Sequence, residues 1–317
     1  MYFPYFRGKR FELLAIRDTA GVIAQHNFVP IIEPVKEQLD DLERALEAIC
    51  EVGAQSILIF NPQNGELVGR ASSVVNLWNE SFSETENVVP GLILTENMSI
   101  EEIVVFCNAH RDHNVALIHQ GFSSGRELAE ALARVNNIQA HVFIAEYSGR
   151  LYRDHFERHP QRVLIDDGFV RRVNRDHPDD EFFSDLIQTH ARDGLQGFGD
   201  FLTVGDEYSQ SGGPAFTVAI HLSYINENRD GSIFIRHFLS DSRLTADDTP
   251  GKFREAMVHL IEFLDSDRSM IEETSAVREL RDLNDRNHYP GLGALKRLSL
   301  THHIETISLS DRQLVEG

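Results

Sequence analysis

The feature that most constrains the fold is a unit that recurs along the first two thirds of the chain. Each unit has a short apolar run rich in β-branched residues, then a polar turn, then an amphipathic helix. Short, continuous apolar runs are typical of strands that are buried on both faces of a parallel sheet. The pattern predicts eight such strands, at residues 4–7, 28–35, 56–62, 91–97, 115–120, 141–147, 162–169 and 200–205.

Eight βα units in a row favour a closed (β/α)8 barrel of the TIM type. The alternative is an open, doubly wound sheet, which usually carries a glycine-rich turn after its first strand. No such turn follows any early strand of this chain. The sequence therefore predicts an α/β barrel, and its 317 residues are enough for a barrel with additions.

Two additions to the barrel are predicted. The first is a β-hairpin with strands at residues 216–225 and 232–239, because Asp230-Gly231 between them is a pair typical of hairpin turns. We expect a barrel over residues 1–267, with a helix at 180–192, the hairpin inserted at 215–240 and a closing helix at 250–264. The second is a helical C-terminal extension, residues 268–317, which we expect to pack on the barrel. In an alternative assignment, residues 216–222 are themselves the eighth barrel strand.

The charge balance limits the classes of partner. Thirty Lys and Arg residues stand against fifty Asp and Glu residues, a net charge of −20. Proteins that grip phosphate backbones or anionic membranes do so with clustered cations, so direct binding to nucleic acid or to a membrane is not expected. No apolar run approaches the roughly 20 residues of a membrane span, and no signal peptide is recognisable. We expect a cytoplasmic protein in which Cys50 and Cys107 are free thiols.

Polar residues that follow the predicted strands form the candidate site, because in a barrel the carboxyl ends of all strands open onto one face. Glu33, Glu146 and Asp166 follow apolar strand cores most directly, so they are the leading candidates for catalytic residues or metal ligands. Carboxylates with histidine and asparagine suit Mg²⁺ or Mn²⁺, and crowded carboxylates can raise the pKa of one another. The other candidates are ligand-binding residues: Arg7, Lys9, Asn61, Glu96, His119, Asp167 and Asp206.

Two interpretations of these strand ends stay open. In one, they hold a metal or a small molecule, and Arg7 and Lys9 bind a small anionic ligand. In the other, they form a salt-bridged mouth without catalysis. Elsewhere, Cys107, His110 and His113 are spaced three apart, which loosely resembles a zinc-ligand pattern, although a core cysteine followed by last-turn histidines explains it as well. The chain has no Walker, dinucleotide-binding or G-x-S-x-G motif.

The opening segment YFPYFRGKRFELLAIRD resembles the start of the bacteriophage beta-protein family and its bacterial relatives. VPIIEP and GFGDF further along are similar to later segments of that family. The resemblance runs from about residue 2 to residue 265. The residues that carry it at the start are Pro4, Arg7, Lys9, Glu12 and Ala15.

The resemblance implies a barrel-like fold and a bacterial or phage origin, and it brings no catalytic residue with it. It also implies a role in phage defence or phage–host conflict, as a binding or scaffold component that acts with a partner protein. The alternative is a divalent-metal-dependent hydrolase of phosphate esters with its site at the barrel mouth. A homo-oligomer formed through the hairpin is a further hypothesis.

Overall fold

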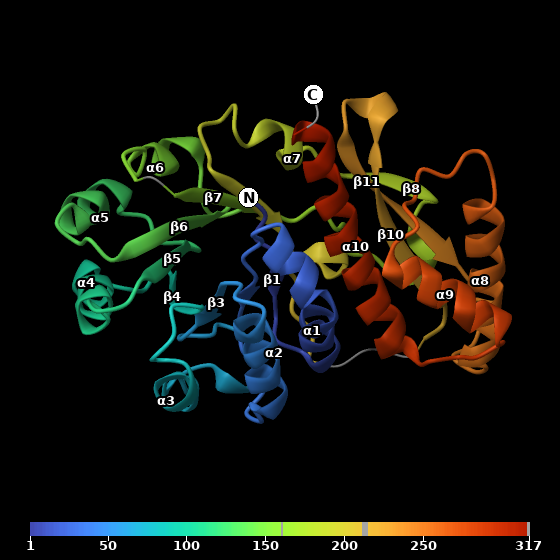
Figure 1. Cartoon of the computed structure of the whole chain (residues 1–317), viewed down its shortest axis with the longest axis horizontal. Helices are drawn as coiled ribbons and strands as arrows, with labels where there is room; N and C mark the ends of the chain where they lie inside the picture. The colour runs from blue at the N-terminus through green and yellow to red at the C-terminus, as the bar shows by residue number, and fades with distance from the viewer. Residues whose placement is uncertain (160, 211–214, 316–317) are drawn as a thin grey trace.

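The computed structural model, which describes residues 1–159, 161–210 and 215–315, has the predicted barrel (Figure 1). Eight strands pair in parallel, and their order around the sheet follows the chain. The ring is closed by backbone hydrogen bonds from Phe3 N to Phe198 O (2.8 Å) and from Phe198 N to Met1 O (3.1 Å). The strands are β1 (Tyr5–Phe6), β2 (Ile31–Ile32), β3 (Ser56–Ile59), β4 (Val88–Leu94), β5 (Val115–His119), β6 (Ile138–Ile144), β7 (Arg162–Asp166) and β9 (Gly197–Asp200).

Alternation along these strands separates two apolar layers, because successive side chains point to opposite faces. Ala116 and Ile118 of β5, for example, belong to the core inside the barrel, whereas Val115 and Leu117 pack outward. The outer layer is covered by α1 (Arg10–Gln25), α2 (Asp40–Glu51), α3 (Ser72–Ser81), α4 (Ile100–Ala109), α5 (Gly125–Leu132) and α6 (Arg150–Asp154).

A second, antiparallel sheet stands beside the barrel. Its strands are β8 (Asp180–Ser184), β10 (Ala219–Asn226) and β11 (Ser232–Leu239), with β11 in the middle. The predicted hairpin is therefore confirmed as β10 and β11. The helix predicted at residues 180–192 is wrong: this segment forms β8 and then the short helix α7 (Leu186–Thr189). The segment contains Phe182 and Phe183, which suit a strand, and it completes the free edge of β11.

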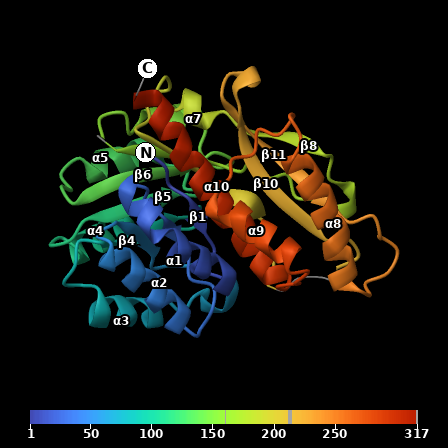
Figure 2. The ribbon, with the colours of Figure 1, turned by 45° about the vertical axis from the view of Figure 1, so that its right-hand side comes forward.

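The last three helices join this sheet to the barrel. α8 (Thr249–Leu264) and α9 (Ser275–Asp285) belong to the core of the second sheet. The helix expected to close the barrel, residues 250–264, thus covers the second sheet instead. α10 (Leu292–Val315), from the predicted extension, lies against both α1 and β10, and it runs between the barrel and the second sheet (Figures 1 and 2). The expectation that the extension packs on the barrel is confirmed.

Two adjacent histidines fasten α10 on both sides. His303 Nε2 lies 3.2 Å from Asp200 Oδ2 at the end of β9, and its Nδ1 lies 2.8 Å from the Ser223 hydroxyl of β10. His302 Nε2 lies 2.7 Å from the carbonyl oxygen of Ser223. Both imidazoles are fully buried, so α10 is a structural part of the junction. No helix in the described part of the chain is long and apolar enough to cross a membrane.

Candidate ligand-binding site at the mouth of the barrel

The mouth of the barrel is the end where the carboxyl ends of the strands open. There an ion pair joins the ends of two neighbouring strands. The parallel pairing of β1 with β2 places the next residue of each strand, Arg7 and Glu33, side by side. Arg7 Nη1 donates to Glu33 Oε2 at 2.6 Å, and Arg7 Nη2 pairs with the Asp206 carboxylate. Gly8 follows with φ of 57°, and a Cβ there would lie 2.9 Å from the carbonyl oxygen of Glu33. Glycine is therefore needed for the chain to turn this close to β2.

Glu33 is fully engaged by its surroundings. Its Oε2 also accepts from the Tyr5 hydroxyl at 3.0 Å, and its Oε1 accepts from Gln63 N at 2.8 Å and from Asn64 Nδ2 at 3.0 Å. The side chain is completely buried. A carboxylate with four donors in this environment has the character of a structural anchor for the strand ends.

Asp167, which follows β7, holds a neighbouring part of the rim. Its Oδ1 accepts from Phe169 N at 3.0 Å, and its Oδ2 accepts from Asp206 N at 2.8 Å, which fixes the loop that carries the partner of Arg7. Desolvation raises the pKa of Asp167 to about 6, and it also raises the pKa of Asp166. Both residues nevertheless remain exposed to solvent.

A cavity of about 520 Å³ opens between this mouth and the second sheet. Among the described residues that line it, five are cationic and two are acidic, the reverse of the balance in the whole chain. Apolar side chains such as Phe169 and Leu295 form the rest of the wall, and the volume suits a small-molecule ligand. The charged lining residues are Arg7, Lys9, Arg171, Arg172, Lys296, Glu12 and Glu207.

Most of the cations in the wall are held by acids. Lys296 pairs with Glu12 at 2.7 Å, and Arg171 pairs with Glu207 at 2.7 Å. Lys9 differs, since its Nζ donates to the backbone carbonyl of Ser209 at 2.5 Å, and no carboxylate pairs with it among the described contacts. Burial, and next to it the positive charge of Lys296, lower the pKa of Lys9. An anion bound beside Lys9 would stabilise the charged amine and so offset the lowering of its pKa.

Residues of the cavity wall also carry buried polar atoms that lack hydrogen-bond partners. Ten buried side-chain nitrogen or oxygen atoms in the described part of the chain have no partner, and five of them belong to residues that line this cavity. Buried polar groups in native proteins are nearly always satisfied, so such a concentration indicates a ligand or ordered water. The five atoms are Arg7 Nε, His177 Nδ1, Thr203 Oγ1, Tyr208 OH and Thr217 Oγ1.

The other candidates from the strand ends do not join this group. Asn61 uses its amide to bridge β3 to Ile93 of β4, with both hydrogen bonds at 2.8 Å, while Glu96 and Glu146 are exposed. His119 points outward, where its Nδ1 lies 2.7 Å from the Tyr152 hydroxyl under the helices. Strand alternation explains this, because Ala116 and Ile118 occupy the inward positions.

The predicted metal ligands are not assembled as a set. The structure brings Arg7, Glu33, Asp167 and Asp206 together, with Lys9 at the rim. Among the described residues, Glu33, Glu146 and Asp166 do not form a group able to hold one ion. The one such group found there is His177, Glu181 and His237, which the sequence analysis did not single out.

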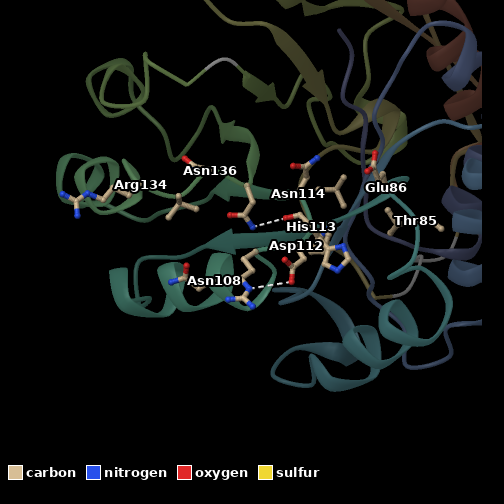
Figure 3. A pocket seen from close by; sticks show the side chains of 14 residues that line it. Thr85, Glu86, Asn108, Asp112, His113, Asn114, Arg134 and Asn136 are labelled. Carbon is tan, nitrogen blue, oxygen red and sulfur yellow. Dashed lines mark hydrogen bonds and ion pairs between the residues drawn. The ribbon is translucent and has the colours of Figure 1, made fainter.

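A second hollow lies at the opposite end of the barrel, where β4, β5 and β6 begin (Figure 3). There the Asn137 amide donates to the carbonyl oxygens of Cys107, His110 and His113 at 2.8–3.1 Å. Cys107 is fully buried, and His110 Nδ1 bonds the carbonyl oxygen of Phe106. The amino-terminal face of a barrel serves stability, so we do not assign a site here, and the spacing of Cys107, His110 and His113 reflects packing.

Comparison with known proteins assigns the chain to no family. No family model matches the chain, and no curated protein sequence matches it. One similar solved structure is the N-acetylneuraminate lyase from Mycoplasma synoviae, with 12% identity and a TM-score of 0.38 over 63% of this chain and 67% of that chain. At this level of likeness the barrel assignment stands on the strand order of the chain itself, and no activity is transferred.

Proposed function

We propose that this chain is a binding protein that takes a small, oxygen-rich anion, such as a phosphate-bearing metabolite, in the cavity at the barrel mouth. The carrying observation is that five of the ten unsatisfied buried polar atoms in the described part of the chain belong to residues that line this one cavity, whose charged residues are mostly cationic in a chain of net charge −20. Arginine, lysine and hydroxyl groups are the donors that recognise phosphate and carboxylate oxygens.

The position of the first helix supports the same ligand class. Lys9, which lines the cavity, is the N-cap of α1, so the helix begins at the cavity wall. The amino terminus of a helix attracts anions, because its backbone N–H groups point outward with a partial positive charge. The apolar part of the wall would accept the non-polar portion of the same ligand.

The cellular role in this proposal comes from the resemblance at residues 2–18. We propose a binding or scaffold component, located in the cytoplasm, that acts with a partner protein in phage defence or phage–host conflict. Occupation of the mouth by its ligand would then control the partner. A homo-oligomer is a further part of the hypothesis, and light scattering of the purified chain would test it.

The alternative, a metal-dependent hydrolase built on Glu33, Glu146 and Asp166, has weaker support. The oxygens of Glu33 already accept four hydrogen bonds, and Glu146 is exposed. The three residues would have to rearrange to share one Mg²⁺ or Mn²⁺ ion.

The test is a thermal-shift titration with pyrophosphate, nucleotides and sugar phosphates, each beside its uncharged counterpart. A ligand at 100 times its Kd stabilises the native state by about 2.7 kcal/mol, which shifts the melting point by several degrees. Lys9→Met should abolish the shift, because it keeps the stem and removes the charge.

Lys36→Met is the matched control, since Lys36 pairs with Glu66 outside the cavity. No shift with any anion, or an equal shift in the Lys9→Met and Lys36→Met variants, would contradict the proposed function.

A further inference from the structure

We propose that His177, Glu181 and His237 form a binding site for a transition-metal ion of the Zn²⁺ type in the wall of the mouth cavity. One ligand atom from each residue lies within 4.8 Å of the other two. The three side chains come from the loop before β8, from β8 and from β11, so the second sheet assembles the site. The proposal does not depend on the anionic ligand, and the two are tested separately.

His177 is the strongest indication of a missing ligand. Only 6% of the residue is exposed, and its Nδ1 has no hydrogen-bond partner in the described structure. Glu181 Oε1, the nearest acid oxygen, lies 3.6 Å away, too far for a hydrogen bond. A buried imidazole nitrogen in this position is satisfied if an ion lies between it and the carboxylate.

His237 completes the set and is held by another histidine. Its Nε2 lies 2.9 Å from Glu181 Oε1, and its Nδ1 lies 2.6 Å from His221 Nδ1 on the neighbouring strand, where the two residues are directly opposite. When His237 Nδ1 carries the proton and donates it to His221, its Nε2 lone pair is free for a metal. Metal-bound histidines are commonly oriented in this way by an acceptor behind them.

The donor set decides the class of ion. Two imidazoles and one carboxylate are typical of zinc and other first-row transition metals, whereas Mg²⁺ and Ca²⁺ prefer oxygen ligands. Three protein ligands leave a coordination position open. His177 and His221 line the mouth cavity, so this position is close to the space for an external ligand.

Arg172 is the competitor at this site. Its Nη1 donates to both oxygens of Glu181, at 2.6 and 2.7 Å. The side chain is 30% exposed, so its end can move toward the solvent. Because a guanidinium and a metal ion repel each other, the arginine should weaken metal binding, and its removal should strengthen it.

The experiment titrates the full chain, stripped with a chelator, with Co²⁺ and Zn²⁺. Visible absorption reports the coordination of Co²⁺, and calorimetry reports the stoichiometry and affinity of Zn²⁺. We expect one ion per chain. His177→Ala should weaken binding at least about tenfold, since loss of even an outer partner of a metal ligand has this effect. His155→Ala is the matched control, because His155 is exposed and outside the group.

Arg172→Gln tests the site in the opposite direction, and we expect it to keep the fold because the Arg172 side chain is 30% exposed. We expect tighter binding of both ions. The proposal is overturned if the wild-type chain shows no saturable binding, or if His177→Ala binds like His155→Ala. Unchanged or weaker binding by Arg172→Gln also overturns it, and this arm decides alone if His177→Ala does not fold.

Discussion

Replacement of Glu33 by glutamine tests whether the mouth of the barrel is built on a structural ion pair. The carboxylate has two donors on each oxygen, Gln63 N and Asn64 Nδ2 on Oε1, and Tyr5 OH and Arg7 Nη1 on Oε2. An amide has one oxygen only, so its NH2 group must face one of these pairs. The least damaging arrangement turns it toward Gln63 and Asn64, where the Asn64 amide can flip but the backbone N–H cannot.

The cost follows from these contacts. One buried N–H without a partner costs about 1–3 kcal/mol, and the loss of the charge that assists the Arg7 hydrogen bond costs about 1–1.5 kcal/mol, the difference between a charged and a neutral hydrogen bond. Arg7 keeps Asp206 as a second partner, so we expect a total of about 3 kcal/mol in the free energy of unfolding. The assay is urea unfolding at pH 7, with the change taken from the midpoint at constant slope.

Glu37→Gln is the control, because Glu37 pairs with Arg70 on the surface, where both side chains are more than half exposed. Such pairs contribute about 0–1 kcal/mol. A Glu33→Gln variant within about 1 kcal/mol of the wild type would refute the anchoring role. Glu33 would then be available for the catalytic role considered from the sequence.

Two further predictions concern buried histidines. First, burial lowers the pKa of His119 to about 3 and the pKa values of His237 and His302 to about 4, so the unfolded chain binds more protons than the folded one below about pH 6.5. Stability should be full above that pH and fall by up to about 1.4 kcal/mol per pH unit for each histidine on acidification. The raised pKa values of Asp166 and Asp167 act in the opposite direction, but both side chains are exposed to solvent. A melting point that stays constant or rises from pH 7 to pH 5 would contradict the prediction. Second, His303→Ala should destabilise the chain by about 2–4 kcal/mol in urea unfolding, because it leaves buried partners unsatisfied on β9 and β10, while His155→Ala should change little.

The barrel could be predicted from the sequence because its signal is local. Each buried parallel strand is a short apolar run, and each helix follows at once. The helix predicted at residues 180–192 was wrong for a different reason. This segment forms β8 because it pairs with β11, some fifty residues later, and the local sequence pattern does not show this pairing. The packing of the C-terminal extension on the barrel was expected, but the pairing of α10 with α1 in particular depends on contacts with the other end of the chain.

In the candidate site, too, the residues that follow barrel strands could be predicted from the sequence, and the others could not. Arg7, Lys9 and Asp206 could be found because they follow strands, and the outward position of His119 was available from alternation within β5. The cations Arg171, Arg172 and Lys296 could not be placed, since they lie outside the barrel strands. One signal was overlooked: the hairpin register set by Asn226 and Ser232 pairs His221 with His237.

The acidic residues of the mouth therefore hold its loops in place, whereas the unsatisfied polar atoms of the wall are available to a ligand. The carboxylates of Glu33, Asp206 and Asp167 accept hydrogen bonds from Arg7 and from backbone N–H groups, which fixes the loops at the rim. Apart from Arg7 Nε, the unsatisfied atoms of the cavity wall belong to other residues, namely His177, Thr203, Tyr208 and Thr217. A barrel enzyme would keep its reactive groups above the strand ends. The proposed binding cavity lies instead between the mouth and the second sheet, so substitutions of its lining residues in β10 and at the start of α10 should change ligand binding more than substitutions at Glu96 or Glu146.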